Sequence, residues 1–159
     1  MKIGFLISQY GDNELAKTFI SSANRFLCDS SGVDIIGFVA NQMKPISHPI
    51  FATMNLNEAF DYDGIVVATT IDLALKLARF PGPTKRYLYL WELMWTRYGF
   101  EELMGLFHNP KLTVVLRTEQ HKEIVEKCWN CNVDWVIPDF DIGLFLKMIN
   151  HKDKNNGKT

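Results

Sequence analysis

The residues from Tyr87 to Phe107, YLYLWELMWTRYGFEELMGLF, combine side chains that could bind or react at the junction of a predicted strand and a predicted helix. Glu92 can accept a proton or hold a hydroxyl group, and Arg97 can bind an anionic group or a carboxylate. An exposed tryptophan beside carboxylates would suit a sugar ring, and Trp91 and Trp95 are the candidates. The alternative is packing: the tryptophans cover the sheet, which is favoured for Trp91, and Glu92 pairs with Arg97 or caps the next helix.

Two further candidate groups follow later strands. His121 lies in the first turn of a predicted helix, where the helix dipole favours a neutral imidazole that can accept a proton. A solvated residue at a helix start is the alternative, and it is favoured. Asp139 and Asp141 flank Phe140 and could form a paired carboxylate site. Asp141 is better interpreted as the cap of the last helix, which leaves Asp139 as a catalytic candidate.

The loop after the first strand offers polar groups for a ligand: Gln9, Tyr10, Gly11 and Asn13. The glycine fingerprints of dinucleotide folds and of P-loops are absent. The segment SQYGDNE faintly resembles the phosphate loop of flavodoxins, with Tyr10 and Asn13 in place of two hydroxyl residues. Gly11 has a second explanation, a tight turn that needs a residue tolerant of positive φ.

The pair Cys128 and Cys131 forms a C-x-x-C motif in a chain with three cysteines. An odd number argues against a disulfide framework. Cys128 falls near the end of a predicted helix, where the dipole disfavours a thiolate, and a zinc site would need two more ligands at suitable spacing. We therefore predict no metal or redox site, a buried Cys128 and an incidental Cys131.

Apolar runs and helical periodicities alternate along the chain. The strands are continuously apolar, which is typical of a parallel sheet covered on both faces. The pattern predicts an α/β, doubly wound, three-layer (Rossmann-like) fold with a mostly parallel sheet of about six strands. The predicted strands are 2–8, 32–41, 62–70, 85–92, 111–118 and 133–139, and the predicted helices are 13–27, 69–80, 98–107, 119–130 and 141–152.

The residues outside these strands and helices include a loop and a C-terminal tail. Residues 43–57 contain two prolines and no periodicity, so they are predicted to form a loop that ends in one helical turn at NLNEAF. Residues 1–152 are expected to form a single domain, and residues 153–159 a polar, disordered tail. In such a fold ligands bind beyond the carboxyl ends of the strands, where all the candidates above lie.

Bulk properties exclude several classes of function. The net charge is -1 and the pI is about 6.4, which disfavours an extended nucleic-acid grip. No apolar run reaches the roughly 20 residues of a membrane span. The start, MKIGFLISQYGDNE, lacks the features of a signal peptide, so a cytoplasmic location is expected.

The run from Tyr87 to Asp141, with its segments LRTEQHKEIVEKCWN and VIPDFD, resembles the N-terminal, acceptor-side domain of GT-B glycosyltransferases, including short versions from tailed bacteriophages. That domain has a strand with a carboxylate or aromatic end, then a helix, then a hydrophobic strand followed by Arg-Ser/Thr, an acid, any residue and His. Arg117 and His121 match this Arg and His. A further helix and a strand ending near Pro-Asp-Phe follow, and the likeness covers most of the chain.

The resemblance implies an acceptor-binding domain, with a first-loop residue and the Glu92 region near the acceptor. It implies no cofactor, and a nucleotide sugar would enter as a substrate. GT-B enzymes hold that sugar in a second Rossmann-like domain, so we expect this domain to act with a partner subunit or to be a catalytically incomplete remnant.

Two other hypotheses stay open. One is a non-catalytic protein-binding or regulatory module that uses the region of Trp91, Trp95 and Arg97, because tryptophan and arginine are enriched at interface hot spots. It would need a protein partner or a second copy of the chain. The other is a small nucleotide or flavin binder.

Overall fold

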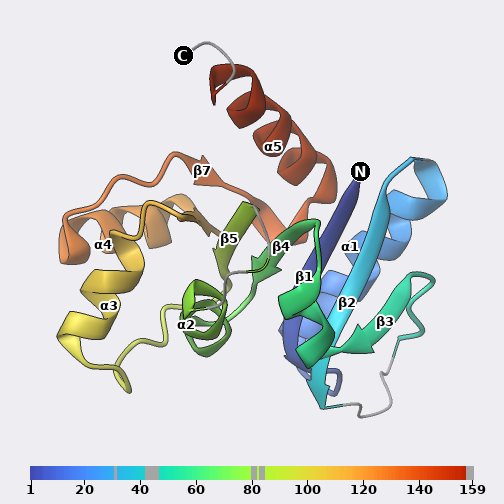
Figure 1. The fold of residues 1–159 in the computed structure, drawn as a ribbon, viewed down its shortest axis with the longest axis horizontal. Helices are drawn as coiled ribbons and strands as arrows, with labels where there is room; N and C mark the ends of the chain where they lie inside the picture. The colour runs from blue at the N-terminus through green and yellow to red at the C-terminus, as the bar shows by residue number, and fades with distance from the viewer. Residues whose placement is uncertain (31, 42–46, 80–81, 83–84, 157–159) are drawn as a thin grey trace.

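A computed structural model describes residues 1–30, 32–41, 47–79, 82 and 85–156, with side chains as far as His151. It contains one seven-stranded sheet in the order β3-β2-β1-β4-β5-β6-β7, and every adjacent pair is parallel (Figure 1). The doubly wound α/β prediction is confirmed, with seven strands in place of six. The strands are β1 (Lys2–Gln9), β2 (Asp34–Asn41), β3 (Ala52–Asn55), β4 (Ile65–Ala68), β5 (Lys85–Leu90), β6 (Leu112–Leu116) and β7 (Trp135–Val136).

Five helices and two short 3-10 segments complete the described fold. They are α1 (Glu14–Asp29), η1 (Leu56–Asp61), α2 (Ile71–Arg79), α3 (Phe100–Phe107), α4 (Glu119–Trp129), η2 (Pro138–Phe140) and α5 (Ile142–Asn156). Figure 1 shows β1 to β3 beside α1 in one half of the molecule, and α3 and α4 beside β5 and β7 in the other. None of the described helices has both the length and the apolar character needed to cross a membrane.

The central strands are apolar throughout because each face of the sheet is covered. In β1, Phe5 and Ile7 point into a core shared with α1 and α5, whereas Leu6 points into a second core shared with α2, α3 and α4. In β5, Tyr89 belongs to the first core and Leu88 to the second. Successive side chains of a strand point to opposite faces, so a strand buried on both sides needs apolar residues at every position.

The edge strand β3 was not predicted. It pairs in parallel with β2, and its four residues carry mostly exposed side chains. An exposed edge strand has no apolar run to detect, and this one falls where a proline-containing loop was expected. The expected helical turn at NLNEAF is confirmed as η1, with Asn55 and Glu58 forming a reciprocal capping box at its start. Residues 43–46 of the expected loop lie outside the described residues.

Polar side chains cap α1, α2 and α5. Asn13 caps α1 by accepting a hydrogen bond from the Ala16 amide at 2.8 Å. At the start of α5, Asp141 accepts one from the Leu144 amide at 3.0 Å, so the cap predicted for Asp141 is confirmed. At the start of α2, Thr70 Oγ1 accepts one from the Leu73 amide at 3.4 Å.

One prediction of burial and two predictions of element boundaries also need correction. The inner face of α4 is Val125 and Trp129, whereas Ile124 and Cys128 are exposed. The final strand is only two residues long, because Pro138 starts the 3-10 turn η2 directly after Ile137. The last helix continues to Asn156, so the tail expected from residue 153 begins as helix.

Candidate functional site

A pocket of about 210 Å³ opens at the carboxyl edge of the sheet. The chain runs from β1 to β2 and β3 on one side and then returns to β4 on the other, so strand order reverses between β1 and β4. This is the position where open α/β sheets bind ligands. The segments after β4 and β5 form most of the walls, and α1 contributes Leu15. The lining residues are Leu15, Thr69, Thr70, Ile71, Asp72, Leu90, Trp91, Glu92, Met94, Arg97 and Tyr98.

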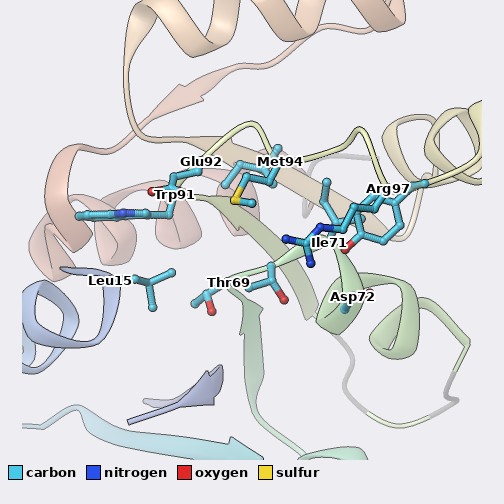
Figure 2. A pocket seen from close by; sticks show the side chains of 11 residues that line it. Leu15, Thr69, Ile71, Asp72, Trp91, Glu92, Met94 and Arg97 are labelled. Atoms are coloured by element: carbon cyan, nitrogen blue, oxygen red, sulfur yellow. The ribbon is translucent and has the colours of Figure 1, made fainter. Parts of the chain in front are cut away.

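Two of the predicted site residues, Glu92 and Arg97, line this pocket together. Figure 2 shows Glu92 on the side of Trp91, whereas the guanidinium group of Arg97 enters from the opposite side and points toward the middle. Both side chains are exposed, and within the described part of the chain no ion pair joins them. The alternative in which Glu92 pairs with Arg97 is therefore wrong, and both residues line the pocket.

The floor of the pocket carries two threonine hydroxyls with different roles. Thr69 is buried, and its Oγ1 donates a hydrogen bond of 2.7 Å to the carbonyl oxygen of Leu6. That bond ties the end of β4 to β1. Thr70 Oγ1 accepts from the Leu73 amide at 3.4 Å, which leaves its hydroxyl hydrogen able to bond a ligand.

Both tryptophans of the opening segment serve packing. Trp91 is 3% exposed; it stacks on Phe140 with ring centroids 5.4 Å apart, and the guanidinium carbon of Arg117 lies 3.6 Å from its ring centroid. The packing interpretation of Trp91 is thus confirmed. Trp95 is half-buried and meets Phe107 and Trp129 edge to face at 6.2 and 5.6 Å. The two rings hold the irregular segment that carries Glu92 in place. Both faces of the Trp91 ring are covered, and Trp95 does not line the pocket.

Arg117 connects three segments of the fold through ion pairs. Its guanidinium group lies 2.9 Å from the Asp139 carboxylate and 3.4 Å from that of Glu14 at the start of α1. Its charge is therefore balanced inside the protein. Asp139, predicted as catalytic, does not line the pocket, and its carboxylate accepts the Arg117 hydrogen bonds. The roles predicted for these two residues find no support in the geometry.

The backbone of Asp139 and Phe140 is left-handed, with φ values of 44 and 55°. Residues other than glycine rarely adopt this conformation unless their surroundings hold them. The hydroxyl of Ser22 donates to the Asp139 carbonyl at 2.8 Å, and Tyr89 donates to the Ile137 carbonyl at 2.8 Å. The turn is therefore fixed from α1 and from β5.

The imidazole of His121 lies near Arg117 and does not line the pocket. Burial lowers its pKa, the Arg117 charge lowers it further, and Glu92 opposes both effects. Its Nδ1 atom is buried without a hydrogen-bond partner. A neutral imidazole is the favoured state at neutral pH, which agrees in direction with the sequence argument, although the cause is burial first.

We expect His121→Gln to flatten the pH dependence of stability below about pH 6.5. A lowered pKa in the folded state means that the unfolded chain binds more protons as the pH falls, so native His121 costs stability from the unfolded pKa down to the folded one. Urea unfolding from about pH 5 to pH 7.5 measures this slope. His48→Gln, at an exposed histidine, is the control and should leave the slope unchanged.

The first-loop residues do not form part of the pocket. Tyr10 is 3% exposed, and its hydroxyl lies where a side chain on Gly37 would be, so it belongs to the core. Asn13 is occupied as the α1 cap. Gln9 is exposed at the end of β1. The expected need for positive φ at Gly11 is wrong, because its φ is not positive and the space around it is open.

Sequence reasoning missed Asp72, Met94 and Tyr98 as pocket residues. Asp72 sits in the first turn of α2, and its position after a strand end was an available signal. Met94 is 53% exposed, an unusual setting for an apolar side chain at a strand end. The pKa of Tyr98 is raised, chiefly by burial and next by the nearby Asp72 carboxylate. Nothing in the sequence indicated that contact.

The C-x-x-C motif lies away from the pocket. Cys128 is exposed, which corrects the prediction of burial, and Cys131 is half-buried. Burial raises the pKa of the Cys131 thiol, so a reactive thiolate is disfavoured there. Among the residues that the structure describes, no three histidine, cysteine, aspartate or glutamate side chains come together as a metal site.

Three comparisons with known proteins, against family models, curated sequences and solved structures, each find no match to this chain. What the protein does is therefore inferred from the arrangement of its own residues. The firm elements are the Rossmann-like α/β fold, with one parallel sheet between helices, and a small pocket at the point where strand order reverses.

Proposed function

We propose that this chain is a glycosyltransferase-like domain whose pocket binds one sugar unit of an acceptor. The observation that carries the proposal is a pocket at the switch point lined from opposite sides by Glu92 and Arg97, neither of which has an ion pair with a residue that the structure describes. The pocket volume of about 210 Å³ lies below the roughly 300–1,000 Å³ of drug-sized sites, so it suits a small ligand or one unit of a larger one.

The lining chemistry suits a polyhydroxylated ligand. Glu92 can accept hydrogen bonds from hydroxyl groups, and the Thr70 hydroxyl and the Arg97 guanidinium can donate them. The apolar side chains of Leu15 and Met94 offer contact to the C–H face of a sugar ring, a part that neither tryptophan can play. A carboxylate, a cation and an apolar wall together cover the groups that a sugar presents.

In this proposal Glu92 is the general base of a glycosyl transfer. In that reaction the acceptor oxygen forms a bond to the anomeric carbon of a nucleotide sugar, and its proton passes to the Glu92 carboxylate. The bond from the anomeric carbon to the phosphate oxygen breaks, and its electron pair leaves with the nucleotide. In the GT-B enzymes that the chain resembles, a second Rossmann-like domain holds the nucleotide sugar.

The test uses the one methionine in the pocket. With protein labelled at methionine methyl groups, we expect neutral mono- and oligosaccharides to shift the Met94 signal in NMR spectra and to leave the signal of buried Met148 in place. Glu92→Gln should weaken this binding about tenfold, because a hydrogen bond to a charged group is lost. Met94→Leu assigns the signal.

Other outcomes would contradict the proposal. A shift with nucleotides or flavins, and none with saccharides, would support the small nucleotide binder. If no small molecule moves the Met94 methyl signal, the protein-binding module becomes the better hypothesis, and of its three residues only Arg97 is exposed.

A further inference from the structure

We infer that the preferred ligand of the pocket is a hydroxylated molecule with one anionic group, a carboxylate or a phosphate, which Arg97 holds. The inference rests on the proposed function, because it names the class of sugar that the same pocket takes. It depends on which charges at this edge of the sheet are already balanced within the protein and which are left facing the pocket.

Three arginines of the described structure differ in their partners. Arg117 lies between the carboxylates of Glu14 and Asp139, and Arg79 lies 3.8 Å from Glu102. Arg97 has no ion pair with any residue that the structure describes, and its guanidinium group points into the pocket (Figure 2). An arginine in this setting presents planar, paired donors that match a carboxylate or a phosphate.

Neither carboxylate of the pocket forms an ion pair with Arg97 among the residues that the structure describes. Asp72 lies at the same end as Arg97, but it bonds the hydroxyl of Tyr98 and lies in the first turn of α2, against the positive end of that helix. Glu92 lies on the opposite side of the pocket, near enough to His121 to raise the pKa of that imidazole. Arg97 therefore supplies hydrogen-bond donors at one end of the pocket, and Glu92 supplies acceptors at the other.

A ligand that satisfies both ends carries an anionic group at one end and hydroxyl groups at the other. Uronic acids and sugar phosphates have this arrangement, whereas a neutral hexose offers the guanidinium group only uncharged acceptors, which form weaker hydrogen bonds. The small volume restricts the recognised part to about one sugar ring and its charged substituent.

The experiment compares matched pairs of ligands by titration of the Met94 methyl signal. The pairs are glucose with glucuronate and galactose with galacturonate, and the two hexose 6-phosphates distinguish a phosphate from a carboxylate. We expect the better anionic member to bind about tenfold more tightly than its neutral partner, since the extra hydrogen bonds are charge-assisted. Arg97→Gln should remove that preference, so that the anionic and the neutral member of each pair bind with affinities within about twofold of each other.

Arg25→Gln, on an exposed arginine of α1 that does not line the pocket, is the matched control and should keep the preference. Equal binding of neutral and anionic sugars would overturn the inference while the proposed function stands. A preference that survives Arg97→Gln would overturn it as well. Failure of every sugar to move the Met94 signal would overturn both.

Discussion

Replacing Trp91 with alanine is expected to lower the free energy of unfolding by about 3–5 kcal/mol, the range seen for large aromatic residues removed from a core. The ring is 3% exposed and lies between Phe140 and the guanidinium group of Arg117, so its loss leaves a cavity and unstacks the arginine. In a protein of this length the melting temperature should fall by roughly 10 °C. Urea unfolding followed by far-UV circular dichroism measures the effect without relying on tryptophan fluorescence.

Two variants make the result specific. Trp91→Phe keeps an aromatic ring at the position and should recover more than half of the lost stability. Arg97→Ala, in the same segment as Trp91, removes an exposed side chain and should change the free energy of unfolding by about 0.5 kcal/mol or less. A loss below about 1 kcal/mol for Trp91→Ala would show that the ring is dispensable to the core.

The different effects expected at Trp91 and Arg97 reflect the two roles of the segment that follows β5. The segment after β5 has no regular secondary structure, so its backbone needs side-chain anchors. Trp91 fixes its start against the α1 side of the sheet, and Trp95 fixes its middle against α3 and α4. The charged residues that follow each anchor are thereby held at the pocket. Packing and binding are separate tasks of neighbouring residues here.

The fold was largely predictable because its signals are local. The apolar runs of β1 and β5 and the helical spacing of α1 reveal elements that are buried on the expected faces. The edge strand β3 left no such signal, since backbone pairing with β2 holds it while its side chains stay exposed. Likewise Cys128 was predicted to be buried but is exposed, because helical spacing does not show how much of the α4 surface other elements cover.

The site was predictable only in part because it depends on contacts between distant segments. The rule that ligands bind at strand ends identified Glu92 and Arg97 correctly as residues at the carboxyl edge. The same rule could not separate them from Arg117, whose partners lie 103 and 22 residues away along the chain. Nor could it show that Asn13 serves the helix that it precedes. Which residue a charged or polar side chain pairs with is decided by the tertiary structure.

Replacing Phe140 with alanine in the otherwise unchanged protein should lower the free energy of unfolding by about 3–5 kcal/mol. This ring is fully buried and contacts four other aromatic rings. They are Phe5, Phe19, Tyr89 and Trp91, at centroid distances from 4.4 to 6.3 Å. Phe140→Leu, which keeps most of the apolar volume, is the control and should cost less than half as much.

The double variant with Trp91→Ala tests whether these two rings act together. Because they stack on one another, the combined loss should fall short of the sum of the single losses by about 0.5–1.5 kcal/mol. Strict additivity would mean that the stacking contributes nothing of its own. Phe140 also holds the left-handed turn that brings Asp139 to Arg117, so the Phe140 variant should lose the Arg117–Asp139 pair, whereas Arg97→Ala should keep it. Chemical shifts of the Arg117 Nε–H group in the two variants check that difference directly.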